Sequence, residues 1–197
     1  LSSAINLMWN NYGRTFAEYI FIKDFRFGRL KNNIEIEGQE IIDDIVKNKK
    51  QVVFISGHLA NFELMAMYLE KSGVNLSAIY RPLNNIFLNA KIEEIRKNYI
   101  CKNQIRKGLG GIKNLISLIK KNFSTALMID QRVSEGILSD FFNEKALTTT
   151  IPAQIVKKFN TPVVPVCIER IEDIKFKITI SKQLTFSENT SVQEITD

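Results

Sequence analysis

Histidine and cysteine are nearly absent from this sequence. Its 197 residues include one histidine, His58, and two cysteines, Cys101 and Cys167. A structural zinc site takes about four thiolate or imidazole ligands, so this inventory excludes one, and we expect no metal site. So few cysteines also exclude a disulfide scaffold and favour a reducing compartment.

Long apolar runs are missing as well. The longest, such as 19–22 and 163–168, are far shorter than the roughly 18 residues of a membrane-spanning helix. The chain begins with Leu1 and shows no signal-peptide pattern. We therefore expect a soluble or peripheral protein that is a fragment of a longer one.

The composition is that of a globular domain. Apolar residues make up 45% and charged residues 24%, which excludes disordered and collagen-like chains. A chain of this length is sufficient for one substantial domain. We expect a single domain over residues 1–197, with a helical N-terminal segment at 1–48 and a catalytic core at 49–197.

Positive charge is concentrated in residues 91–121, which we call the basic segment. It holds nine lysines and arginines against two glutamates, a net charge of +7, while the whole chain carries +6. Either an anionic partner binds here or two helices expose solvated faces. No aromatic residue interleaves with the cations between Lys102 and Lys121, which argues against nucleic acid.

Apolar periodicity predicts alternating strands and helices. The run 51–57 is β-branched and apolar and ends in a glycine, which is typical of a strand buried on both faces. The other expected strands are 76–80, 125–129, 162–168 and 174–180, and the expected helices are 59–71, 86–99, 109–121 and 153–159. This order predicts an α/β fold with a mixed, largely parallel sheet flanked by helices.

An aromatic stripe marks the N-terminal region. Its members recur at intervals of three and four and are Trp9, Tyr12, Phe16, Tyr19 and Ile20. Such spacing usually indicates an amphipathic helix that packs on a core, and a helix that lies in a membrane interface is the alternative.

Polar residues follow three of the predicted strands, where sites of open α/β sheets gather. They are Ser56, Gly57 and His58 after the first, Arg81 after the second, and Asp130, Gln131 and Arg132 after the third.

His58 is a candidate general base. Glu63 lies five residues further on, and a carboxylate there could orient the imidazole and stabilise its charged form. The alternative is that His58 only caps the helix and that Glu63 occupies an exposed face. Arg106 and Lys107 precede a glycine-rich helix start, which predicts either a weak phosphate site or a plain turn.

No serine elbow or neighbouring cysteine offers an enzyme nucleophile. The base would therefore activate a hydroxyl of the substrate for attack on an activated acyl group. An arginine at a neighbouring strand end would stabilise the oxyanion or hold a phosphate.

Several sequence blocks resemble the lipid A biosynthesis acyltransferases of the lysophospholipid acyltransferase superfamily. The blocks are NYGRTFAEY at 11–19, SGHLANFE at 56–63, YRPLNN at 80–85, MIDQR at 128–132, FF at 141–142 with TTT at 148–150 and PA at 152–153, and TPVVPV at 161–166. The resemblance implies a glycerolipid acyltransferase-like fold, with His58 as base and Glu63 as its orienter. The residues expected to bind substrate are Asn61, Arg81, Arg106, Lys107, Asp130, Gln131 and Arg132.

The resemblance also implies the partners. An acyl carrier protein would deliver the acyl thioester, with no other cofactor, to a Kdo-bearing lipid A precursor at the cytoplasmic face of the bacterial inner membrane. A lysophospholipid or glycolipid acceptor is the nearest rival, and a non-catalytic basic domain on membrane or nucleic acid is a more distant one. Members usually begin with a membrane-anchoring helix and close with a Trp-x-His-Arg-Arg-like segment. Neither is present, so we expect a partial chain.

Overall fold

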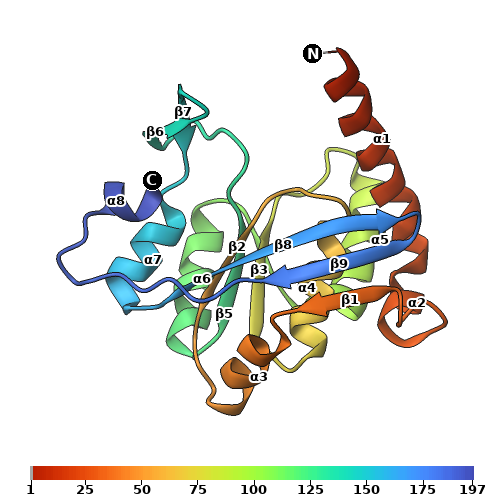
Figure 1. Cartoon of the computed structure of the whole chain (residues 1–197), viewed down its shortest axis with the longest axis horizontal. Helices are drawn as coiled ribbons and strands as arrows, with labels where there is room; N and C mark the ends of the chain where they lie inside the picture. The colour runs from red at the N-terminus through yellow and green to blue at the C-terminus, as the bar shows by residue number, and fades with distance from the viewer. Residues whose placement is uncertain (1) are drawn as a thin grey trace.

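A seven-stranded sheet with helices on both faces forms the body of the molecule (Figure 1). The structure is a computed structural model that describes residues 2–197, apart from the side chain of Leu109. The sheet order is β1-β9-β8-β2-β5-β3-β4. The strands are β1 (Ile34–Glu37), β2 (Val53–Ser56), β3 (Leu76–Tyr80), β4 (Asn103–Arg106), β5 (Ser124–Met128), β8 (Val163–Glu172) and β9 (Lys175–Ile180).

Helices fill most of the connections. They are α1 (Ser2–Glu18), α2 (Ile22–Phe27), α3 (Gln39–Lys47), α4 (Phe62–Lys71), α5 (Ile86–Ile95), α6 (Leu109–Lys120), α7 (Ile151–Phe159) and α8 (Val192–Thr196). A 3-10 turn, η1 (Tyr19–Phe21), follows α1, and a π-helical turn, η2 (Arg96–Ile100), follows α5. A separate hairpin consists of β6 (Ile137–Phe141) and β7 (Glu144–Thr148).

The sheet is mixed and mostly parallel, as the sequence predicts. Strands β8, β2, β5, β3 and β4 run in one direction, so their carboxyl ends meet at one edge. Only β9 and β1 run the other way, because β9 is antiparallel to β8. The long strand β8 joins the two parts, since residues 163–165 pair with β2 and residues 166–172 pair with β9.

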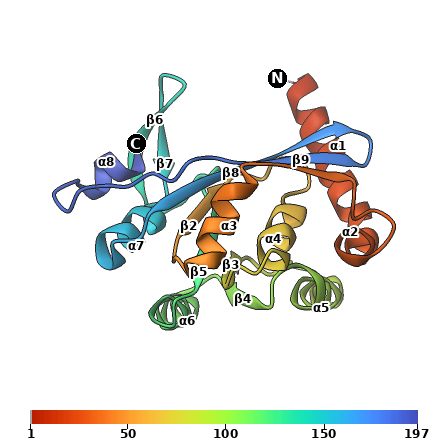
Figure 2. The same cartoon turned by 60° about the horizontal axis from the view of Figure 1, so that its bottom comes forward.

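Two apolar cores lie on opposite faces of the sheet, between the helices seen on either side in Figure 2. Phe54 of β2 packs into the core that α2, α3 and α4 cover. Its neighbour Val53 points into the core that α6 and α7 cover. Burial on both faces is why the sequence of β2 is continuously apolar rather than alternating.

The predicted elements lie close to the observed ones, but three strand regions were not predicted. Strand β1 lies within the segment 1–48, expected to be helical, and pairs with β9. Strand β4 holds one buried apolar residue, Ile105, and the hairpin β6–β7 is largely exposed. Edge strands and exposed hairpins bury little surface, so their sequences carry a weak apolar pattern.

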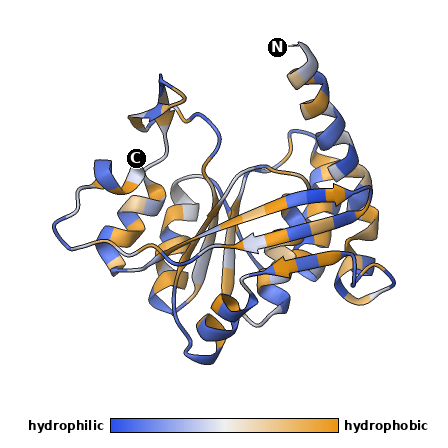
Figure 3. Cartoon of the chain, viewed as in Figure 1, coloured by the Kyte–Doolittle hydropathy of each residue, from blue (hydrophilic) through white to orange (hydrophobic). Residues whose placement is uncertain are grey.

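Helix α1 and the hairpin project from the same side of the molecule (Figures 1 and 2). The aromatic stripe does not pack on the core as a unit, because only Tyr19 is buried, while Trp9 is 66% exposed and Phe16 and Ile20 are exposed too. Apolar residues lie along both projections (Figure 3), and Phe142 at the hairpin tip is 87% exposed. Within residues 2–197, no helix has the length and apolarity needed to span a bilayer.

Candidate active site

His58 and Asp130 form the centre of the site, at the carboxyl ends of the adjacent strands β2 and β5. The register pairs Ser56 with Met128, which brings the residues that follow these strands together. The Nδ1 atom of His58 lies 2.8 Å from Oδ1 of Asp130, and the His58 backbone N–H donates to Oδ2 at 2.9 Å. A carboxylate at Nδ1 favours the tautomer with the proton there, so Nε2 keeps a free lone pair.

The surroundings of His58 leave its ring accessible. Phe62 contacts the imidazole edge-on, with ring centroids 4.8 Å apart. The His58 side chain is 20% exposed and that of Asp130 is 40% exposed. A base that must meet a substrate needs such partial access, whereas a histidine that served only as a helix cap would not require a carboxylate on its ring.

Among the described residues, the polar partners of Glu63 are Arg96 and Tyr19, and it makes no hydrogen bond to His58. The buried carboxylate of Glu63 accepts hydrogen bonds from Nε of Arg96, at 2.9 Å, and from the hydroxyl of Tyr19. A buried carboxylate needs a counter-charge, and Arg96 of η2 supplies it on the side of α4 that faces the core. Asp130, which we expected to bind substrate, takes the place at the imidazole.

Arg96 and Tyr19 of this cluster keep their protons near neutral pH. Burial and the negative charge of Glu63 raise the pKa of Tyr19 far above its usual value. Burial lowers the pKa of Arg96, but the negative charge of Glu63 and the hydrogen bonds to Glu63 and Tyr19 outweigh this and raise it. No proton leaves either group near neutral pH, so the cluster ties α4 to η1 and η2 and is not itself a proton donor.

Cations follow the same edge of the sheet. In strand order β2, β5, β3, β4, the residues after the strands are His58, then Asp130 to Arg132, then Arg81, then Lys107. Arg81, Gln131, Arg132 and Lys107 are all exposed. Arg106 is exposed as well, with Nη2 3.9 Å from Glu93. The fold therefore brings the expected cations to the edge that carries His58.

Gly108 precedes α6 and Gly111 lies in its first turn, and the backbone geometry requires glycine at both positions. A Cβ on Gly111 would lie 2.0 Å from the carbonyl oxygen of Arg106, a distance that real Cβ atoms do not adopt. Gly108 has φ +133, in the region that favours glycine. The plain-turn interpretation therefore accounts for these glycines.

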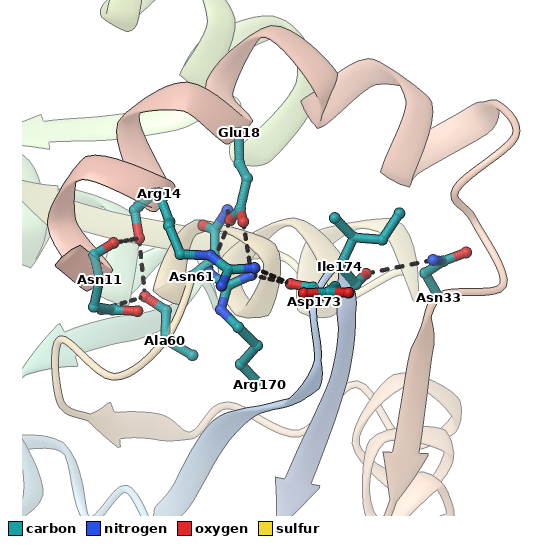
Figure 4. A network of polar contacts seen from close by, with 10 residues as sticks. Asn11, Arg14, Glu18, Asn33, Ala60, Asn61, Arg170, Asp173 and Ile174 are labelled. Atoms are coloured by element: carbon teal, nitrogen blue, oxygen red, sulfur yellow. Dashed lines mark hydrogen bonds and ion pairs between the residues drawn. The ribbon is translucent and has the colours of Figure 1, made fainter. Parts of the chain in front are cut away.

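Asn61, which we expected to bind substrate, is fully buried. Its Nδ2 donates to Oε2 of Glu18 at 2.8 Å, and Arg170 of β8 binds the same carboxylate (Figure 4). The side chain therefore faces α1 instead of the open edge of the sheet.

Sequence reasoning missed the side chains of α1 that hold the loop after β2. Asn11, Thr15 and Glu18 recur at helical spacing, a signal that the aromatic stripe on the same helix obscured. The partner of Glu18, Arg170, lies 152 residues away in sequence, where no local pattern could reveal it.

The fold and the site together define a class of enzyme. A histidine held by a carboxylate, at a sheet edge rich in cations, suits a group-transfer enzyme that activates a hydroxyl of its substrate. A family model described as bacterial lipid A biosynthesis acyltransferase matches residues 2–197. The chain belongs to this family, which confirms the resemblance and makes it an acyltransferase of lipid A biosynthesis. A comparison with curated proteins gave no match.

Proposed function

We propose that this acyltransferase moves a fatty acyl chain from an acyl carrier protein thioester to a hydroxyl of a Kdo-bearing lipid A precursor. The observation that carries the proposal is the contact of His58 Nδ1 with Asp130, because it leaves Nε2 free as a base at the open edge of the sheet. In this proposal the thioester is a substrate and the reaction uses no resident cofactor.

The chemistry requires one proton carrier. Nε2 of His58 takes the proton of the acceptor hydroxyl as its oxygen attacks the thioester carbonyl carbon. The C–S bond of the resulting tetrahedral intermediate then breaks, and the imidazolium returns the proton to the leaving thiolate. Asp130 stabilises the imidazolium between these two transfers.

The cations support an acidic donor and a phosphorylated acceptor. Arg81 and Arg132 follow adjacent strands, and a guanidinium can bind phosphate through two parallel hydrogen bonds. Arg106 and Lys107 belong to the basic segment, whose net charge of +7 would attract an acidic carrier protein. A lysophospholipid presents a single phosphate group and needs fewer of these cations.

The projecting apolar residues support a peripheral position on the inner membrane, where the acceptor lipid resides. Trp9 of α1 and Phe142 of the hairpin are mostly exposed, and the two elements that carry them project from the same side of the molecule (Figure 1). Large apolar side chains on such projections are typical of membrane-interface contacts. Phe142→Ser should weaken sedimentation with anionic vesicles. Leu184→Ser should not, because Leu184 is exposed but pairs with Val163 at the start of β8, outside both projections.

Mass spectrometry of lipid A tests the function directly. The full-length gene would be expressed in a host that lacks its own late acyltransferase, with His58→Ala as the matched control. We expect a new acyl mass with the wild type and none with the variant, because His58 is the histidine that Asp130 holds at the open edge of the sheet. Acylated lysophospholipid with unchanged lipid A would instead identify the rival acceptor.

A further inference from the structure

The loop of residues 57–61, which carries His58, has an unusual backbone conformation. Ala60 has φ +40, in the left-handed region that residues with a Cβ rarely adopt. Its carbonyl oxygen lies 3.0 Å from Nδ2 of Asn11 and 3.0 Å from the hydroxyl of Thr15, both on α1 (Figure 4). The Thr15 hydroxyl also lies 2.9 Å from the carbonyl oxygen of Asn11, so its one proton is shared between two acceptors, and Nδ2 of Asn11 is the undivided donor. Two side chains of another element therefore contact the carbonyl of Ala60.

The side chain of Asn61 does not cap the helix that follows it. Asn61 occupies the residue before α4, where an asparagine side chain usually accepts a backbone N–H of the first turn. It makes no such bond and donates to Glu18 of α1 instead. The loop therefore contacts α1 at two successive residues, through three side chains that we call the polar stripe (Asn11, Thr15 and Glu18).

The far side of Glu18 is anchored as well. Both carboxylate oxygens accept from the guanidinium of Arg170, at 2.7 and 3.2 Å. The same guanidinium lies over the ring of Phe176 and donates to the carbonyl of Asp173 in the turn between β8 and β9. Arg170 thus fixes Glu18 to the sheet, and the hydrogen bond from Asn61 to Glu18 in turn fixes the position of Asn61.

We propose that the polar stripe of α1 positions His58 for catalysis, so that α1 is a working part of the active site. The proposal rests on the proposed function, in which His58 is the base. Asp130 fixes the imidazole from β5, and the polar stripe fixes the other end of the loop at Ala60 and Asn61. Without the stripe, Ala60 has no reason to keep a left-handed conformation, and its return to an ordinary one moves the loop and turns Nε2 away from the acceptor.

The single histidine makes this testable without an activity assay. The double variant Asn11→Ala/Thr15→Val removes both donors to Ala60, and Asn10→Ala on the exposed face of the same helix is the matched control. In ¹⁵N NMR of the imidazole, we expect wild type and control to show the Nδ1–H tautomer and the double variant to show a mixture. We expect kcat of acyl transfer to fall about 10- to 100-fold with KM nearly unchanged, because a displaced base slows chemistry more than binding.

Ala60→Gly supplies the rescue. Glycine adopts a positive φ without strain, so it needs fewer contacts to keep the loop in place. Added to the double variant, it should restore the Nδ1–H tautomer and part of the lost kcat.

Each readout can overturn the proposal. Imidazole signals identical to wild type in the double variant would show that the polar stripe does not position His58. A kcat loss that only follows a loss of thermal stability, with no rescue by Ala60→Gly, would show a purely structural role. If the wild type transferred no acyl group, the proposed function would fail, and the imidazole signals would still decide whether the stripe positions His58.

Discussion

Substitution of Asp130 by asparagine tests which of two carboxylates, Asp130 or Glu63, stabilises the charged form of His58. The amide keeps the shape and can still accept one hydrogen bond, but it cannot stabilise an imidazolium. A hydrogen bond to a charged group contributes about 1.5–3 kcal/mol. Because the Asp130 side chain is 40% exposed and partly screened by water, the lower half applies, about 1.5–2 kcal/mol. That corresponds to a fall in kcat of about 10- to 30-fold, with little change in melting temperature.

The matching variant at Glu63 should behave in the opposite way. Glu63→Gln leaves the buried guanidinium of Arg96 without a counter-charge, while the amide oxygen still accepts a hydrogen bond. Removing one partner of a buried ion pair lowers the free energy of unfolding by about 3–5 kcal/mol. Because the amide keeps one hydrogen bond to Arg96, we expect a smaller loss of about 2–3 kcal/mol here. For a chain of this size the melting temperature falls by about 4–12 °C. The kcat of the molecules that remain folded should change little.

Acyl transfer and thermal unfolding would be measured in parallel for both variants. Asp44→Asn, at an exposed acid of α3 that pairs with Lys50, serves as the control for loss of a surface charge. If Glu63→Gln lowered kcat more than Asp130→Asn, at an unchanged melting temperature, then Glu63 would be the working partner of His58. The role assigned to Asp130 would then be refuted.

Three further predictions concern the surface of the site and the thiols. Charge reversal at Arg106 and Lys107 should weaken binding of acyl carrier protein at low salt and much less at high salt, with a melting temperature near wild type, because exposed cations attract partners but stabilise little; equal affinity at all salt concentrations would contradict this. Arg81→Lys should lower the rate with the lipid A precursor and Arg81→Ala should lower it further, since lysine keeps the charge but not the planar fork; full activity of Arg81→Ala would exclude a phosphate contact. Burial raises the pKa of the Cys101 thiol to about 12 and also raises that of Cys167, so at pH 8 both remain protonated thiols; half-buried Cys167 should react slowly with a thiol reagent and buried Cys101 only on unfolding, which mass analysis of the labelled peptides would show.

The parts of the fold with a strong local pattern were predictable from sequence. The apolar run of β2 and the spacing of α4 follow from burial, and the polar residues after β2, β3 and β5 do lie at one edge of the sheet. The edge strands β1 and β4 were not predicted, because neighbours on one side only leave their sequences weakly patterned.

The partners of the site residues could not be derived from spacing. Glu63 lies only five residues after His58 in sequence. The direction of its side chain nevertheless depends on the position of Arg96, 33 residues further on. Asp130 was recognised as a residue at a strand end, but its contact with His58 depends on the pairing of β2 with β5 across 72 residues. Strand register and the pairing of buried charges depend on the tertiary structure. A sequence motif shows which residue types are present but not which of them contact one another.

The contact between Glu18 and Arg170 also bears on the order of events during synthesis. The two residues are separated by 152 positions, so at translation rates of about 5–20 residues per second roughly 8–30 s pass between them. During that time the nascent chain can already bring His58 and Asp130 together, since both precede Arg170. Before Arg170 is synthesised, however, Glu18 lacks the guanidinium that balances its charge when it is buried. We therefore expect α1 not to dock stably against the loop of residues 57–61 at that stage. Docking of α1 is thus expected to be a late folding step that follows emergence of β8 from the ribosome.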